Sequence, residues 1–263
     1  MSLARARQAA RAAGFVGITG ALIPVYVTRD RLASAATRDA VRDRWLARWA
    51  GALLRLFAVR VELLEPLPPR PEGAARRGRL VVCNHRSAID VVVLLGTLGG
   101  RMVSRADLSG WPVVGAAARS VGTVFVDRSD AGSGASAIRE VRGLLRAGQT
   151  VIVFPEGTTF AGDEVRPFQA GAFLSAVSSD AEILPVGLAY EAGSDAAYVN
   201  ETFPAHLARL AAAPRPTRVR VAIGPPIPTR VDGAKGARAA ALAEQAHAAV
   251  EREVARARRS FEA

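Results

Sequence analysis

The sequence predicts an α/β protein with a mostly parallel central sheet flanked by helices, preceded by an N-terminal membrane-associated helical segment. Short apolar or β-branched runs alternate with helical stretches over the last two thirds of the 263-residue chain. This alternation is typical of a sheet covered by helices. The first quarter differs, being apolar and rich in arginine. We therefore expect a membrane-associated helical segment over 1–65, a linker over 66–78 and an α/β domain over 79–263.

Composition excludes several classes of protein. Hydrophobic residues make up 50% of the chain and charged residues 22%, which excludes intrinsic disorder. One cysteine, Cys83, excludes an internal disulfide framework, and three histidines without a Cys-x-x-Cys motif exclude a structural zinc site. We therefore expect no metal and no tightly bound cofactor.

The net charge of +11 indicates an anionic partner, which is either a membrane surface or nucleic acid. Residues 1–70 contain 12 arginines and 5 acidic residues, a net charge of +7, next to apolar and tryptophan-bearing segments. No nucleic-acid-binding motif accompanies this charge. The distribution favours an anionic membrane surface, and no nucleic acid partner is expected.

An uncharged run of 17 residues, 12–28, lies between Arg11 and Arg29. This length is at the lower limit for crossing a bilayer core, and Pro24 and three glycines weaken the run as a simple helix. No convincing signal-peptidase site follows it. We interpret the run as a retained membrane-inserted or re-entrant segment, with a buried core helix as the alternative.

A second helix is predicted over 37–60, where apolar residues recur at steps of three and four. Its apolar face includes Trp45 and Trp49, and Arg44, Arg48 and Arg55 line the edge of that face. Tryptophan at headgroup depth and arginine near anionic lipid are typical of an interfacial helix. A helix packed on the domain with a solvated arginine edge is the alternative. The Pro-, Gly- and Arg-rich stretch 66–78 is expected to be the linker.

The domain itself is expected to contain alternating strands and helices. The strands are predicted at 79–83, 122–126, 150–154, 182–189 and 217–223, and the helices at about 88–95, 133–147, 168–177 and 237–258. Ser87 and Asp90 fit the N-cap and N3 positions of a capping box, so the first of these helices should begin at Ser87.

Polar residues that suit general-base chemistry follow the first strand of the domain, in Asn84-His85-Arg86-Ser87-Ala88-Ile89-Asp90. If the chain before the helix is extended, His85 can fold back so that Asp90 accepts its ring N–H. The carboxylate then fixes the tautomer and leaves the other ring nitrogen as a base. No G-x-S-x-G nucleophile motif occurs, and Cys83 is expected to be buried. Such a pair suits a reaction in which a substrate hydroxyl attacks an acyl thioester.

A second polar block, Pro155-Glu156-Gly157-Thr158-Thr159-Phe160, follows the strand at 150–154. Gly157 would let a ligand approach the backbone, and Thr158 offers a hydroxyl. A tight turn with a solvent-facing glutamate is the alternative. Arg105 and Arg128 lie between the two blocks and could hold a phosphate, although Arg128 could equally pair with a neighbouring aspartate.

Four blocks in order resemble the glycerolipid acyltransferase family, typified by 1-acyl-glycerol-3-phosphate acyltransferase. They are NHRSAID (84–90), the RADL to FVDR stretch (105–128), FPEGTTF with RPFQAGAF (154–173) and ILPVGL (183–188). The resemblance implies that His85 is the general base and that Asp90 orients it. It also implies an acyl-CoA or acyl-carrier-protein donor and a lysophospholipid acceptor. The substrate-binding residues it indicates are Asn84, Arg105, Arg128, Glu156, Gly157, Thr158 and Thr159.

One departure from the family pattern concerns the acceptor. The third block commonly reads Glu-Gly-Thr-Arg, with the arginine near the acceptor phosphate, and Thr159 occupies that position here. We expect 1-acyl-sn-glycerol-3-phosphate as acceptor, giving phosphatidic acid. The alternatives are another lysolipid such as lyso-ornithine lipid, or a basic non-catalytic lipid- or nucleic-acid-binding protein. The positive N-terminal flanks indicate a location at the cytoplasmic face of the cell membrane.

Overall fold

A single mixed sheet organises the protein, whose structure is a computed structural model that describes residues 2–70, 77–162, 164–230 and 232–262. Within these residues eight strands are arranged in the order β1-β7-β6-β2-β5-β3-β4, with β8 paired to β6. Only the pairings of β6 with β7 and β8 are antiparallel, so the predicted mostly parallel sheet is confirmed. The strands are β1 (Val59–Leu63), β2 (Arg79–Cys83), β3 (Arg101–Arg105), β4 (Val124–Val126), β5 (Thr150–Val153), β6 (Glu182–Tyr190), β7 (Thr217–Ile223) and β8 (Ile227–Pro228).

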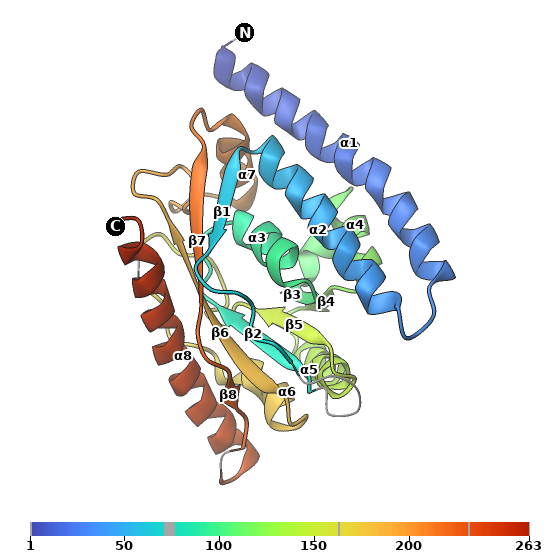
Figure 1. The fold of residues 1–263 in the computed structure, drawn as a ribbon, viewed down its shortest axis with the longest axis vertical. Coiled ribbons are helices and arrows are strands. Elements are labelled where there is room, and N and C mark those ends of the chain that lie inside the picture. Colours follow the sequence, from blue (N-terminus) through green and yellow to red (C-terminus); the bar gives the residue numbers. More distant parts are fainter. Residues whose placement is uncertain (1, 71–76, 163, 231, 263) are drawn as a thin grey trace.

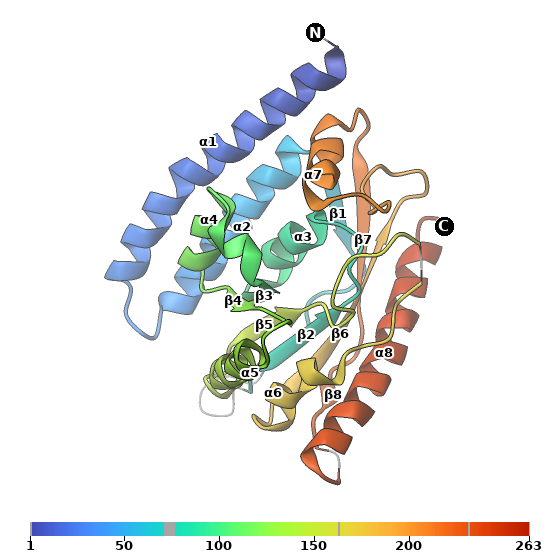
Figure 2. The same ribbon diagram turned by 180° about the vertical axis from the view of Figure 1, so that it is seen from behind.

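Helices cover both faces of the sheet (Figures 1 and 2). They are α1 (Leu3–Leu32), α2 (Arg38–Leu56), α3 (Ile89–Leu98), α4 (Val114–Ser120), α5 (Ala131–Arg146), α6 (Leu174–Val177), α7 (Phe203–Ala212) and α8 (Lys235–Arg259), with short 3-10 helices η2 (Ala106–Gly110) and η3 (Ala170–Phe173). Strand β2 is buried on both sides, and its side chains alternate between the layers. Val81 and Cys83 pack with α1, α2, α3 and α7, whereas Leu80 and Val82 pack with α5, α6 and α8.

Helix α8 crosses β6 at a very short distance, and Gly187 permits this crossing. A Cβ atom at Gly187 would lie 2.3 Å from the backbone nitrogen of Val254 in α8. Only glycine fits this close approach of two backbones. The glycine of the ILPVGL block therefore has a packing role, on the face of the sheet opposite α3.

The five predicted strands are present with small shifts at their ends, but β1, β3 and β8 are additional. The helix predicted over 37–60 ends at Leu56, and the chain then forms β1, which pairs in parallel with β7. Residues 59–63 therefore belong to the same sheet as the domain. The predicted helix at 168–177 begins as the 3-10 turn η3 and becomes α-helical at Leu174. Residues 71–76 of the predicted linker lie outside the described residues.

Helix α1 is continuous, so the re-entrant form of the predicted membrane segment is wrong. Only 17% of its most apolar 18-residue stretch is buried, which also excludes a core helix. By length and composition alone, α1 is apolar enough to cross a membrane. In Figures 1 and 2 it lies outermost, alongside α2.

The tryptophans of α2 face α1 and not a membrane. Trp45 and Trp49 are buried, and their indole N–H groups donate to the carbonyl of Leu22 at 2.8 Å and to the hydroxyl of Thr19 at 3.1 Å. The prediction that these indoles lie at headgroup depth is therefore wrong. The apolar stripe of α2 is covered by protein, because α1 supplies both the packing surface and the hydrogen-bond acceptors. Arg44, Arg48 and Arg55 are exposed.

Candidate active site

His85 and Asp90 form a hydrogen-bonded pair at the carboxyl end of β2. Nδ1 of His85 lies 2.9 Å from Oδ2 of Asp90, and Asp90 is fully buried. The same Oδ2 accepts the backbone N–H groups of Arg86 at 2.6 Å and Ser87 at 2.8 Å. Because three donors converge on one carboxylate oxygen, the turn between strand and helix is held in one shape. Nδ1 is committed to Asp90, which leaves Nε2 of His85 to act as a base.

The capping box at the start of α3 is present only in part. Asp90 accepts the Ser87 N–H, as the box requires, but the Ser87 hydroxyl accepts the Ile89 N–H at 3.2 Å. Helix α3 therefore begins at Ile89, two residues later than predicted. The carboxylate that would cap a helix is used here to hold an imidazole.

The imidazole ring is fixed on a second side by Phe154, the residue that follows β5. The two rings stack with centroids 3.9 Å apart and an interplanar angle of 10°. The His85 side chain is 19% exposed, and the open part of the ring lines a cavity of about 1250 Å³. The His85 ring therefore has a fixed orientation, and its open side faces the cavity.

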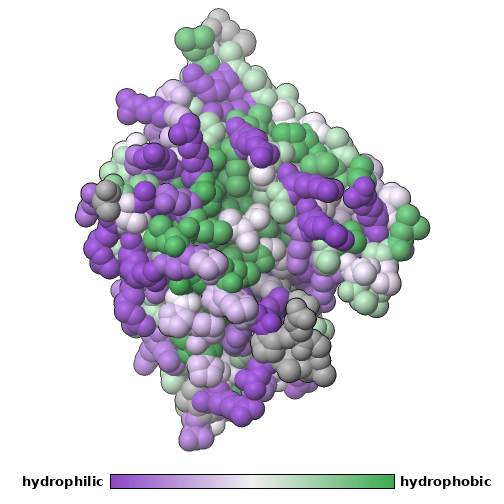
Figure 3. Space-filling model, viewed as in Figure 1, coloured by the Kyte–Doolittle hydropathy of each residue, from purple (hydrophilic) through white to green (hydrophobic). Residues whose placement is uncertain are grey.

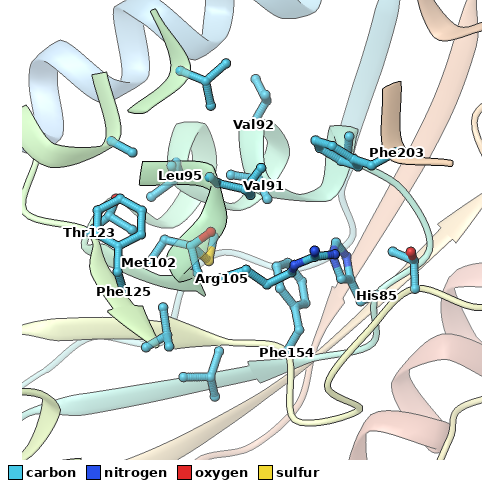
Figure 4. Close-up of a pocket in the computed structure, with 18 of the residues that line it drawn as sticks. His85, Val91, Val92, Leu95, Met102, Arg105, Thr123, Phe125, Phe154 and Phe203 are labelled. Carbon is cyan, nitrogen blue, oxygen red and sulfur yellow. The ribbon is translucent and has the colours of Figure 1, made fainter. Parts of the chain in front are cut away.

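The cavity is mainly apolar and reaches from His85 between the sheet and helices α1, α2, α4 and α7. Figure 4 shows apolar side chains around it, among them Val91, Leu95, Met102 and Phe125. Its volume is large for a single small ligand, since drug-sized pockets occupy roughly 300–1,000 Å³. Charged groups lie at the His85 end, among them Arg105 and Glu156. The cavity thus suits a molecule with a long apolar chain and a polar head.

Most of the predicted site residues line this cavity. They are His85, Arg105, Arg128, Glu156, Gly157, Thr158 and Thr159, whereas Asn84 and Asp90 lie behind His85 in the protein. Arg105 extends toward His85 in Figure 4. Its guanidinium is bidentate to Asp107, with nitrogen–oxygen distances of 3.0 and 2.8 Å.

Arg128 donates to the carbonyl of Gly157, the glycine of the second polar block, which has a φ of +90°. The alternative pairing of Arg128 with Asp127 or Asp130 does not appear among the hydrogen bonds and ion pairs described for this part of the chain. Burial lowers the pKa of Arg128, and the positive charge of Arg105 lowers it further. Arg105 and Arg128 therefore lie near each other at the polar end of the cavity. The hydroxyls of Thr158 and Thr159 belong to the loop that contains Gly157.

Asn84 and Glu156 use their polar atoms on backbone groups. The Asn84 amide exchanges two hydrogen bonds with the backbone of Leu188 in β6, at 3.0 and 2.8 Å. Glu156 accepts the N–H of His85 at 2.7 Å and that of Arg166 at 3.0 Å, and it is 6% exposed. The alternative of a solvent-facing glutamate is therefore wrong. Both residues shape the loops of the site, and direct substrate contact by either stays a prediction.

Two further residues of the site were not identified from the sequence, although Tyr190 follows the ILPVGL block by two residues. Tyr190, at the end of β6, donates its hydroxyl hydrogen to Oδ1 of Asp90. His206, in α7, contacts Ser87 and Ala88 in the turn between β2 and α3. Both are about a hundred residues or more away in the chain, so only the folded structure brings them to the site.

A histidine–carboxylate pair that faces an apolar cavity beside a mostly parallel sheet suits a protein that acts on a hydroxyl group next to a long apolar chain. The chain belongs to the Acyltransferase family, whose model matches residues 58–189, half of the chain. The glycerolipid acyltransferase resemblance is therefore confirmed.

Several known proteins are similar to this chain. A 1-acyl-sn-glycerol-3-phosphate acyltransferase of Neisseria meningitidis is 30% identical over 149 residues, which are 57% of this chain and 56% of that protein. This chain thus spans little more than half of that relative. A lyso-ornithine lipid O-acyltransferase of Pseudomonas aeruginosa is 31% identical over 262 residues, covering 94% and 93% of the two chains. The crystal structure of the acyltransferase PlsC from Thermotoga maritima has the same fold, with a TM-score of 0.66, 21% identity and 97% of each chain covered.

Proposed function

We propose that the protein is an O-acyltransferase that moves a fatty acyl group from a thioester donor to the free hydroxyl of a lysophospholipid. The observation that carries the proposal is the His85 ring, held by Asp90 through Nδ1 and facing an apolar cavity with Nε2 as its free base. Family membership supports the same reaction.

The proposed reaction starts with Nε2 of His85 removing the proton of the acceptor hydroxyl as the oxygen attacks the thioester carbonyl. The tetrahedral intermediate collapses, the carbon–sulfur bond breaks and the leaving sulfur takes the proton from the His85 imidazolium. The products are an ester and a free thiol, and the imidazole is neutral again. Asp90 stabilises the imidazolium and keeps Nδ1 protonated. The donor is acyl-CoA or acyl-carrier protein, and these steps use no metal and no further cofactor.

A protein nucleophile is not part of this proposal. Ser87, the serine beside the pair, is fully buried, and its hydroxyl lies 3.3 Å from His206 and not against His85. Cys83 is also buried, and burial raises the pKa of its thiol, which keeps it protonated. The acceptor hydroxyl is therefore the nucleophile.

The first acceptor we propose is 1-acyl-sn-glycerol-3-phosphate, which would give phosphatidic acid. Arg105 and Arg128 are two cations at the polar end of the cavity, and guanidinium groups bind phosphate well. A relative from Neisseria meningitidis carries the corresponding name.

A second acceptor, lyso-ornithine lipid, is supported by two observations. Thr159 takes the place of an arginine on the loop next to Arg128, and Arg105 is already neutralised by Asp107. Both features reduce the positive charge available to a phosphate. The relative that is similar over nearly its full length carries the name lyso-ornithine lipid O-acyltransferase.

We also propose that the protein associates with the cytoplasmic face of the membrane through α1. Its exposed residues between Arg11 and Arg29 are uncharged: Ala12, Ala13, Val16, Gly17, Gly20, Ala21, Pro24, Val25 and Thr28. In Figure 3, apolar and weakly polar residues follow α1 along the upper right edge, and hydrophilic residues gather over α2. The exposed arginines of α2 would meet anionic lipid headgroups.

The test is an acyl-transfer assay over a panel of lysolipid acceptors with both donor types. We expect ester formation with at least one anionic or zwitterionic lysolipid, and His85→Ala should lower kcat about 10²–10⁴-fold, the usual contribution of a general base. Circular dichroism should show that the variant is folded. Transfer at the wild-type rate by a folded His85→Ala protein would exclude the proposed mechanism.

A further inference from the structure

A second histidine contacts the catalytic turn, residues 84–88 between β2 and α3, from helix α7. His206 lies in α7, is 1% exposed, and its Nε2 is 3.2 Å from the backbone N of Ala88 and 3.3 Å from the hydroxyl of Ser87. Ser87 and Ala88 lie between His85 and Asp90 in the chain, and the Ser87 N–H donates to the same Asp90 oxygen as His85. The turn that carries the pair is thus held by hydrogen bonds to Asp90 and to His206.

The hydrogen bonds fix the protonation of His206. A backbone N–H is only a donor, so Nε2 must accept the hydrogen of Ala88 with its lone pair. The ring proton then resides on Nδ1, which donates to Oε1 of Glu201 at 2.9 Å. Nη2 of Arg209 also lies 3.2 Å from Nδ1, and it donates to the same Glu201 oxygen at 2.5 Å. Burial lowers the pKa of His206, in agreement with a neutral ring.

Glu201 and α7 are themselves held firmly. Arg209 donates to both carboxylate oxygens of Glu201, and these bonds lower the pKa of Glu201 to about 2, so it stays ionised. At the other end of α7, Arg11 of α1 donates to the carbonyls of Leu210, Ala211 and Ala213. Both ends of α7 are therefore fixed, and the helix can hold the turn in place.

We infer that His206 is a positioning residue for acyl transfer, which holds the turn between His85 and Asp90 by accepting the Ala88 N–H. This inference rests on the proposed function, since the effect of His206 is measured as the kcat of acyl transfer. His206 also lines the cavity, but its Nε2 is occupied by the turn.

A serine–histidine–glutamate triad is the rival interpretation of Ser87, His206 and Glu201. The Ser87 hydroxyl also accepts the Ile89 N–H, and the side chain is fully buried and does not line the cavity. A nucleophile must reach its substrate, so this arrangement serves to hold the turn and not to attack a thioester.

Two amide substitutions separate positioning from general support of the fold. His206→Gln places its amide oxygen near the position of Nε2, where it accepts the Ala88 N–H, whereas the shorter His206→Asn does not reach that far. We expect kcat of His206→Asn to fall roughly ten- to hundredfold, which corresponds to one buried donor without a partner. We expect His206→Gln to keep kcat within about threefold of wild type, and KM for donor and acceptor to change little in both.

His247 of α8 offers a matched control. It is a partly buried histidine with a ring contact to Phe168 and a carbonyl partner, Val165, but it lies away from the catalytic turn. His247→Asn should leave kcat unchanged.

Hydrogen exchange at the Ala88 amide supplies the second measurement. Protection should be present in wild type and in His206→Gln and lost in His206→Asn. Equal kcat values for the folded His206→Gln and His206→Asn variants would overturn the inference. Rapid hydrogen exchange of the Ala88 amide in wild type would also overturn it, and this measurement does not depend on the folding of a variant. If wild type transfers no acyl group to any acceptor, the proposed function fails, and exchange at Ala88 still decides whether His206 holds the turn.

Discussion

Oε1 of Glu156 accepts the backbone N–H of His85 at 2.7 Å, which ties the loop after β5 to the turn after β2. Its other oxygen, Oε2, accepts the backbone N–H of Arg166 at 3.0 Å. Burial raises the pKa of Glu156, although the two N–H donors oppose this shift. The glutamate of the second polar block thus fixes the backbone position of His85.

Replacing Glu156 by Gln should lower kcat by roughly tenfold, because the amide NH₂ group would face a backbone N–H in place of an acceptor. The raised pKa of Glu156 also makes the difference in stability between wild type and Glu156→Gln depend on pH. Since the folded pKa of Glu156 is raised, its contribution to stability is present in full below the unfolded pKa and is lost as pH rises through the folded pKa. Thermal unfolding between about pH 4 and pH 8 should therefore show the stability of wild type relative to Glu156→Gln decreasing as pH rises. A pH-independent difference would contradict this.

Tyr190→Phe removes the hydrogen bond to Oδ1 of Asp90, the oxygen that does not contact His85. Burial and the nearby Asp90 charge raise the pKa of Tyr190 well above its ordinary value, so the phenol remains a donor at every working pH. A hydrogen bond to a charged group contributes about 1.5–3 kcal/mol, so kcat should fall roughly ten- to hundredfold if the carboxylate loses its orientation. KM values should stay near those of wild type. Steady-state kinetics with unchanged kcat would show that Asp90 is held without Tyr190.

Local patterns predict the contacts that lie within one stretch of chain. The pairing of His85 with Asp90 follows from a strand that leads into a helix, and the buried strands β2, β5 and β6 follow from apolar runs. Strand β1, by contrast, has polar residues at alternate positions, Arg60 and Glu62, and follows directly on a helix. Its place at the edge of the sheet depends on pairing with β7, which is remote in the chain.

The sequence of an amphipathic helix shows which face is covered, but it does not show whether lipid or protein covers that face. The stripe with Trp45 and Trp49 fits a membrane interface and a protein neighbour equally well, and the acceptors on α1 decide for protein. Asn84 likewise lies between a strand and His85. The neighbouring sequence does not indicate that the Asn84 amide forms hydrogen bonds with both the carbonyl and the N–H of Leu188.

Arg105 provides a test of the acceptor headgroup. If the acceptor carries a phosphate, Arg105→Ala should raise its KM about tenfold while changing KM for a zwitterionic lysolipid less than about twofold, because a charged hydrogen bond is lost. Asp107→Asn should have the opposite effect, since it frees the guanidinium from its bidentate partner. Kinetics of both variants on both acceptors measure this. Equal changes for the two acceptors would assign Arg105 a structural role.

The exposed face of α1 provides a test of membrane association. Removing residues 1–35 would also uncover Trp45 and Trp49 and open the cavity, because α1 packs on both. Charge substitutions at Ala21 and Val25 avoid this problem, because both residues are exposed and neither lines the cavity. Ala21→Glu with Val25→Glu should weaken binding to anionic vesicles, since two carboxylates would enter the lipid interface. The matched control, Ala240→Glu with Ala248→Glu, makes the same change of charge on the exposed face of α8, which lies on the opposite side of the sheet (Figure 1).

Vesicle sedimentation at low and high salt, with transfer assays on the same proteins, separates the possible outcomes. Each basic residue near an anionic surface contributes about 1 kcal/mol, so binding of wild type should also decrease as salt rises. The α1 variant should lose activity on bilayer-embedded acceptor but keep it on a monomeric short-chain acceptor, because His85 and Asp90 are untouched. The α8 control should bind vesicles more strongly than the α1 variant. Equal binding of the two double variants would show that the outer face of α1 does not contact lipid, and membrane association would then have to be sought on another surface.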